Sequence, residues 1–218
     1  MSRRGEKLSI ARQERAALAD LLDRVGPDHP TLSGPWTTRD LAAHLVIREG
    51  RPDATLGIVV RPLSRYTERV RKKTARRPYD ELVERIRSGP PLWSPFRIPV
   101  IDRAGNAAEY FVHHEDVRRA VDGWEPREPD GERYRTLLAV LRRMGRILFR
   151  RSQVTVRVDP GTGTPVTVRD VADAPKVTII GSPDELLMFA YGREARSRVE
   201  LDGDDEAVAA FRSANRSV

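Results

Sequence analysis

The chain of 218 residues contains no cysteine, no long apolar run and no apolar stretch at its start. Without cysteine there can be no disulfide and no thiolate ligand, so any metal must be bound by histidine, aspartate or glutamate. Charged residues follow Met1 to Gly5, and we therefore expect no signal peptide. No run reaches the length of a membrane span. These absences agree with a cytoplasmic location and with no membrane partner.

Basic residues outnumber acidic ones, and the formal net charge is +7. The densest basic cluster runs from Arg61 to Arg77 and has the charge that phosphate binding requires. The only aromatic residues within or beside it are Tyr66 and Tyr79, so few rings are present on which nucleic-acid bases could stack. No nucleic-acid recognition motif accompanies it. Arginine supplies 35 of the 39 basic residues over the whole chain. We therefore expect a solvated helix face here, and a nucleic-acid-associated protein that uses this cluster is the less favoured alternative.

The hydrophobic content of the whole chain, 39%, is sufficient for a core, and helical periodicity dominates the first two-thirds. Thr37 and Asp40 have the spacing of a capping box, which predicts a helix that runs to about Arg48. One or two charged helices are expected between Pro62 and Ser88, broken near Pro78, and a proline-rich connector follows. The main helices are predicted over about 9–25, 37–48, 106–121 and 132–150. Four helices with one apolar face each predict a bundle.

The pattern changes after Ser152. Alternating residues at 154–158 and 166–169 predict a hairpin with a long loop, and further strands are expected at 176–180 and 198–201. Ser182, Pro183 and Glu185 predict the capped start of a helix that stops at Gly192, and a short helix is expected at 204–211. The chain is thus predicted to be α+β, with a helical bundle over 1–152 and a small α/β domain over 153–218.

Two segments carry residues suited to metal chemistry. Glu109 and His113 are four residues apart, which puts a carboxylate and an imidazole on one helical face. On a helical wheel Asp116 falls within about 60° of both, whereas His114 points away. His44 lies in the middle of the second predicted helix. Two imidazoles and one carboxylate can hold a divalent metal and leave a coordination position open.

The sequence resembles the mycothiol-dependent maleylpyruvate isomerase family, which belongs to the DinB-like metal-binding bundles. The resemblance is carried by the segments Trp36 to Leu45 (WTTRDLAAHL) and Gly181 to Leu187 (GSPDELL), by Tyr191-Gly192-Arg193, and by the spacing of Glu109 and His113. It covers nearly the whole chain and is closest to an uncharacterised metal-binding branch with the string His113-His114-Glu115-Asp116. It implies a DinB-like four-helix bundle followed by a small C-terminal domain.

The resemblance also implies a site and a chemistry. It assigns His44, Glu109 and His113 as ligands of zinc or another divalent ion, and nickel, iron or manganese would fit the same donors. The implied cofactor is mycothiol, whose thiol would occupy the open position and attack a small electrophilic substrate in a transfer or an isomerisation. Arg193 resembles a family position at which an arginine faces the cleft, where it would hold an anionic substrate or the polar portion of the thiol. Asp116 would orient an imidazole from outside the ligand set.

Each of these features has an ordinary alternative. His44 could be a hydrogen-bonded core histidine, and Glu109 with His113 could be a surface pair at helical spacing. Asp116 could pair with Arg119 or Arg39, and Arg193 could be a helix C-terminal cation favoured by the helix dipole. A metal-binding protein without turnover therefore stands beside the enzyme, because ligands do not guarantee a substrate pocket.

Overall fold

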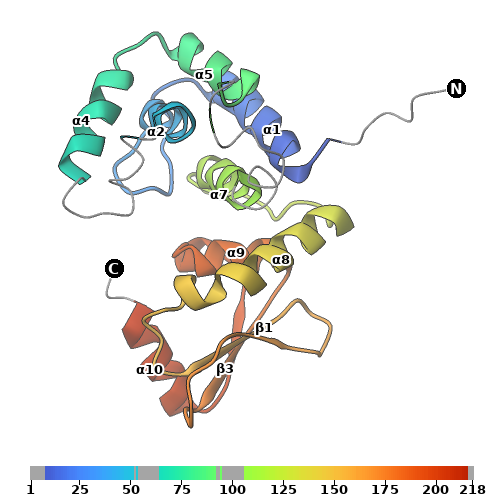
Figure 1. Cartoon of the computed structure of the whole chain (residues 1–218). Coiled ribbons are helices and arrows are strands. Elements are labelled where there is room, and N and C mark those ends of the chain that lie inside the picture. The colour runs from blue at the N-terminus through green and yellow to red at the C-terminus, as the bar shows by residue number, and fades with distance from the viewer. Residues whose placement is uncertain (1–7, 52, 54–63, 92–93, 95–105, 216–218) are drawn as a thin grey trace, which may run out of the picture. The chain divides into compact units, whose positions relative to one another are not determined.

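The computed structural model describes residues 8–51, 53, 64–91, 94 and 106–215 (Figure 1). It contains helices and a small four-stranded sheet, so the predicted α+β class is confirmed. The chain forms two compact units, one up to Pro126 and one from Arg127. The described helices include none that is both long enough and apolar enough to cross a bilayer.

The N-terminal unit is built from helices packed around one apolar core (Figure 1). These are α1 (Ile10–Val25), α2 (Thr38–Gly50), α4 (Ser64–Thr74), α5 (Tyr79–Ser88) and α7 (Ala107–Arg118). Helix α1 packs against α5 and α7, and α2 packs against α4 and α5. Core residues come from four of these helices and include Leu18, Leu22, Leu41, Leu45, Leu82, Ile86 and Tyr110. Leucine and isoleucine at helical spacing supply this core, as the periodicity predicted.

The ends of these helices follow their local sequence. Thr37 and Asp40 form the predicted capping box, in which the backbone N–H of Thr37 donates to Asp40 Oδ2 at 3.3 Å. Gly26 ends α1 with a φ of 79°, a conformation that glycine adopts without strain. The predicted break near Pro78 separates α4 from α5. Half of the proline-rich connector (residues 92, 93, 95 and 96) lies outside the described residues, as do Arg61 and Pro62.

The C-terminal unit combines a mixed sheet with three α-helices. Its elements are α8 (Gly131–Leu148), β1 (Thr155–Asp159), β2 (Val166–Arg169), β3 (Lys176–Ile180), α9 (Pro183–Ala190), the short 3-10 turn Glu194–Arg196, β4 (Glu200–Asp202) and α10 (Asp205–Asn215). The sheet order is β2-β1-β3-β4, with β1 and β3 parallel and the outer pairs antiparallel. The predicted hairpin and the two further strands are confirmed. Val156 and Val177 pair at the centre of the sheet and are fully buried.

Helix α8 belongs to the C-terminal unit, where it packs against β2 and α9. A buried ion pair joins α8 to α9, with Arg133 Nη2 2.8 Å from Asp184 Oδ2. The apolar stripe of α8 predicts the fourth helix of the bundle, with a domain boundary near Ser152. An apolar stripe identifies the face that a helix buries but not the elements that cover it, and here these are strand β2 and helix α9.

Gly145 lets α8 approach the sheet closely. A Cβ atom at this position would lie 2.5 Å from Val168 Cβ and 2.8 Å from the Val168 carbonyl oxygen. Gly145→Ala is therefore expected to destabilise the protein by roughly 1–3 kcal/mol through overpacking, which outweighs the gain of up to about 1 kcal/mol in helix propensity. Denaturant unfolding would measure this. Gly131→Ala, at the start of the same helix, is the matched control and should unfold like the wild type, because its Cβ meets only the Arg135 side chain at 3.4 Å.

Two local predictions need correction. Helix α9 starts as expected at Pro183, but the Ser182 side chain caps nothing and Glu185 accepts a hydrogen bond from the Arg198 backbone N–H at 2.7 Å. The capping box predicted there is wrong because Glu185 is buried and pairs with the segment before β4 instead. Helix α7 ends at Arg118, three residues before the predicted Val121.

Candidate metal centre

Helices α2 and α7 bring the three predicted ligands together. Nε2 of His44 lies 3.3 Å from Glu109 Oε1, and Nε2 of His113 lies 3.2 Å from the same oxygen. One ligand atom from each residue lies within 4.8 Å of the other two. The rings of His44 and His113 meet edge to face at 5.4 Å. Two imidazoles and one carboxylate, separated by up to 69 positions of sequence, thus converge on one point.

Asp116 lies behind His113 and fixes the direction of its ring. Asp116 Oδ2 accepts a hydrogen bond from His113 Nδ1 at 3.0 Å and another from Ser33 Oγ at 2.9 Å. With its Nδ1 proton held there, the imidazole presents Nε2 towards Glu109. Arg119, one of the alternative partners of Asp116, pairs with Glu115 instead at 2.5 Å. Metal-bound histidines commonly donate their second N–H to such a carboxylate.

Glu109 is ionised at the centre of this cluster. Burial alone would raise its pKa, but hydrogen bonds from His113 and His44, with the charges of His113 and Arg48, hold the pKa well below its ordinary value. Arg48 Nε lies 3.3 Å from Glu109 Oε1, and Arg48 Nη1 donates to Asn106 Oδ1 at 2.5 Å. The centre therefore presents a carboxylate anion next to a fixed guanidinium.

The two histidines differ in protonation. The pKa of His44 is lowered, chiefly by burial, although its hydrogen bond to Glu109 opposes this. Burial acts in the same direction on His113, but its hydrogen bonds to Asp116 and Glu109 and their charges raise its pKa to about 9. Near neutral pH, His44 is a neutral imidazole and His113 is an imidazolium that bridges two carboxylates.

Residues that were not predicted as part of the site also lie around the metal centre. The ring of Trp36 lies 5.3 Å from that of His44, and the Arg71 guanidinium lies 4.9 Å from the Trp36 ring centre. Arg48, which lies beside Glu109, was not identified from the sequence. Its position four residues after His44 places both on one face of α2, and this spacing is the signal that could have identified it.

His114 serves a different pair. Its Nδ1 lies 3.0 Å from Glu14 Oε2 on α1, so the ring points away from His113 and from the centre, as the helical wheel predicted. Both members are buried. The choice of His113 over His114 as the ligand thus agrees with the direction of each side chain.

Arg193 lies in the C-terminal unit, beyond the end of α9. Its Nη1 donates to the Tyr191 carbonyl at 2.6 Å, and it lines a cavity of about 470 Å³ with other residues that include Arg150, Arg151 and Phe149. His44, Glu109 and His113 all belong to the N-terminal unit. The structure therefore gathers the predicted metal ligands within the N-terminal unit, and Arg193 belongs to the C-terminal unit.

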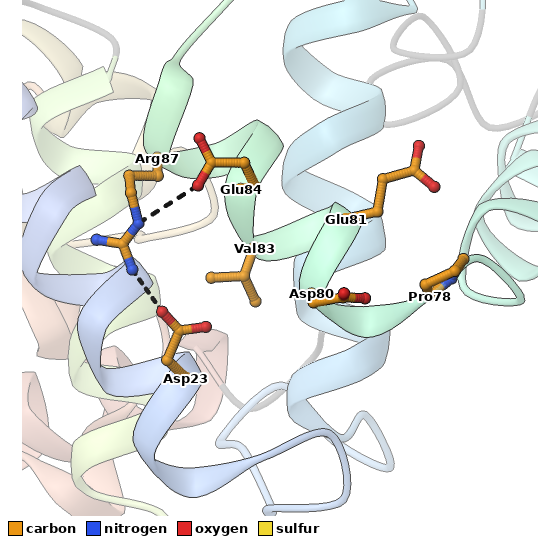
Figure 2. Close-up of a pocket in the computed structure, with 7 residues that line it drawn as sticks. All are labelled: Asp23, Pro78, Asp80, Glu81, Val83, Glu84 and Arg87. Atoms are coloured by element: carbon orange, nitrogen blue, oxygen red, sulfur yellow. Dashed lines mark hydrogen bonds and ion pairs between the residues drawn. The ribbon is translucent and has the colours of Figure 1, made fainter.

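A separate, acidic cavity of about 460 Å³ lies over α1 and α5 (Figure 2). Figure 2 shows Arg87 between Asp23 and Glu84, with Arg87 Nη2 2.5 Å from Asp23 Oδ2 and Arg87 Nε 3.8 Å from Glu84 Oε2. Glu81 points away from this group. Asp23 and Glu84 are arranged around an arginine and do not converge with histidine nitrogens as the donors of the metal centre do.

The residues of the centre fit a divalent cation. The two histidines direct Nε2 at one carboxylate, and Asp116 already occupies the other nitrogen of His113. Nitrogen and carboxylate donors without thiolates suit zinc and other first-row divalent ions. Comparisons with protein-family signatures, with curated proteins and with solved structures returned no match to this chain.

Removing the charge of Asp116 is expected to weaken metal binding. At pH 9, where His113 of the wild type is already about half neutral, Asp116→Asn should lower the affinity for zinc by about 10–100-fold, the usual cost of losing a carboxylate that orients a metal-bound histidine. Competition with a chelator of known affinity would measure it. Ser33→Ala, which removes the other partner of Asp116 Oδ2 but leaves the carboxylate, is the matched control and should bind almost normally. Equal affinity in Asp116→Asn and the wild type would exclude an orienting role.

Proposed function

We propose that the N-terminal unit is a DinB-like bundle that binds a divalent metal through His44, Glu109 and His113, and that the protein is a mycothiol-dependent transferase or isomerase. The observation that carries the proposal is the convergence of three donor atoms within 4.8 Å of one another. Zinc is the ion we expect, and nickel, iron and manganese suit the same donors.

The packing supports the bundle part of the proposal. Helices α1, α2, α5 and α7 share one core, and the centre lies between α2 and α7. Metal sites in helical bundles are commonly built from side chains on facing helices. The small α/β unit that follows also agrees with the resemblance seen in the sequence.

The donor set suits thiol chemistry. A bound divalent metal with a free coordination position would lower the pKa of a coordinated thiol and supply a thiolate nucleophile at neutral pH. The protein has no cysteine of its own, so the thiol must come from a small molecule. Mycothiol is that molecule in our proposal, in a cytoplasm where thiols stay reduced.

The residues of the centre would have different roles in the reaction. His44 supplies a neutral imidazole, Glu109 supplies negative charge, and Asp116 holds His113 in position. Arg48 places a cation beside the centre and could stabilise negative charge on a substrate. We assign to Arg193 the binding of an anionic group, either of the substrate or of mycothiol.

Two outcomes are open to a thiolate held at such a centre. It can add to an activated carbon–carbon double bond, which then rotates as a single bond before the thiolate leaves, and this is an isomerisation. It can also displace a leaving group from an electrophilic carbon and stay attached to the product, and this is a transfer. Both use a small electrophilic substrate.

Adding mycothiol to protein loaded with cobalt tests the proposal. We expect a sulfur-to-cobalt charge-transfer band that saturates at one thiol per metal, and no such band when the sulfur of mycothiol is blocked by methylation. Asp116→Asn, loaded with cobalt at saturating concentration, should develop the same band. Metal bound at one equivalent without any spectral response to mycothiol would contradict the enzyme and leave a non-catalytic metal-binding protein.

A further inference from the structure

The positive charge of this chain is concentrated in one short segment. Residues 64–77, which comprise α4 and the turn after it, contain seven basic residues and one acidic residue, a net charge of +6. The other 204 residues contain 32 basic and 31 acidic residues. The abundance of arginine along the whole chain conceals this, because elsewhere acidic residues balance it. Almost the entire excess charge of the protein therefore lies on α4 and its C-terminal turn.

Helix α4 has two faces of different character. Arg65, Arg69, Lys72 and Lys73 are exposed and fall within about 100° on a helical wheel. Arg71 lies on the opposite side and is buried, with its guanidinium against Trp36 and hydrogen-bonded to Asp40 and Glu68. One arginine thus attaches the helix to the unit while four cations face outwards.

Among the described residues, the outward cations make almost no ion pairs that would stabilise the fold. Within the described part of the chain, Arg65, Arg69 and Lys73 make no ion pair, and Lys72 has only a 3.6 Å contact with Glu68. The arginines of α5 behave differently, since Arg85 and Arg87 both pair with carboxylates. The cations of α4 contribute little to stability, because each repels its neighbours on the same face.

We propose that the outward face of α4 binds the phosphate backbone of duplex nucleic acid without reading its sequence. Arg65 and Lys73 are separated by about 12 Å along the helix at 1.5 Å per residue, so this face can reach several phosphates. The major groove of a duplex is about 12 Å wide and admits an α-helix. Arginine and lysine neutralise such phosphates and release counterions. Tyr66 lies at the edge of this face, where its hydroxyl donates to Asp53 Oδ2 at 2.7 Å, and no aromatic residue lies between the four cations on the helical wheel, which favours contact with the backbone over stacking on bases.

The surroundings of α4 favour a duplex over an anionic membrane. The following helix, α5, carries Asp80, Glu81 and Glu84, three residues that line the acidic cavity of Figure 2. Exposed carboxylates on the neighbouring helix, Asp80 and Glu84, disfavour attachment to an extended anionic surface, whereas contact with a duplex needs α4 alone. The four cations also have no apolar residue between them on their face that could enter a bilayer.

A charge-matched pair of variants tests the proposal. Arg65→Gln/Arg69→Gln/Lys73→Gln neutralises the face, and Arg142→Gln/Arg143→Gln/Arg146→Gln removes three exposed arginines from α8. Both variants have a formal net charge of +4, because each loses three of the seven excess charges. Binding to a labelled 20-bp duplex of arbitrary sequence would be measured by fluorescence anisotropy between about 50 and 200 mM salt, the range in which phosphate contacts dominate.

The α4 variant should lose about tenfold or more in affinity, and its log–log salt slope should fall by roughly 2.7, since each phosphate contact contributes about 0.9. The α8 variant should bind like the wild type. Equal losses in the two variants would overturn the proposal, because net charge alone would then explain binding. Failure of the wild type to bind the duplex would overturn it too. So would α4-dependent binding to vesicles of phosphatidylserine and phosphatidylcholine but not to the duplex.

Discussion

Replacing His44 or His113 with alanine is expected to abolish stoichiometric metal binding. Each change leaves one imidazole and one carboxylate, and the affinity for zinc should fall by more than about 100-fold, beyond the cost of losing an orienting partner alone. Purified wild-type protein loaded with zinc and passed through gel filtration should retain close to one equivalent by elemental analysis. Either variant should retain almost none.

His29→Ala is the matched control for these variants. It also removes one of the four histidines, but His29 lies in the loop before α2, where its Nδ1 is 2.8 Å from the Pro30 carbonyl oxygen. Its metal content should equal that of the wild type. Circular dichroism would verify that each variant is folded. Zinc retained by folded His44→Ala and His113→Ala at the wild-type level would refute the assignment of the centre.

Metal affinity is also expected to depend steeply on pH. A histidine binds a metal only through a neutral nitrogen, so below its pKa of about 9 His113 must lose a proton for each metal bound. The apparent affinity should therefore fall about tenfold per pH unit below pH 9, which is roughly 100-fold between pH 9 and pH 7. His44 adds nothing to this dependence near neutral pH, because its pKa is lowered and it is already neutral.

Calorimetry in buffers of different ionisation enthalpy would count the protons released. One proton per metal is expected at pH 7.5 and fewer as the pH rises through 9. Asp116→Asn provides the comparison, since loss of this carboxylate removes a main cause of the raised pKa of His113. In that variant the pH dependence should shift to lower pH. An affinity for zinc that does not change between pH 7 and pH 9 would contradict the bridging imidazolium.

The local parts of the structure could be predicted because neighbouring residues decide them. The capping box of Thr37 and Asp40, and the hairpin of β1 and β2, depend on residues a few positions apart and are confirmed. The elements that pack against the apolar face of α8 could not be predicted, because either a sheet or a helix can bury such a face. Glu185 shows the same limit, since its partner, the Arg198 backbone, is brought near only by the folded chain.

The candidate centre was predictable only in part for a related reason. Helical spacing places Glu109, His113 and Asp116 on one face of α7 and turns His114 away. No spacing rule connects α7 to His44, 65 residues earlier, and that pairing came from the family resemblance. Arg48 was missed because a single arginine on a helix is usually solvated, and only packing shows that this one reaches Glu109.

The loop before α2 is attached to the metal centre through α7. The Leu32 backbone N–H donates to the Asp116 carbonyl at 3.0 Å, and Ser33 Oγ donates to the carboxylate of the same residue. A ligand that binds only the folded form stabilises whatever must be ordered to receive it. Metal binding and ordering of this loop should therefore be thermodynamically coupled. The hydrogen-exchange rate of the Leu32 amide should then fall as the fraction of protein with bound metal rises.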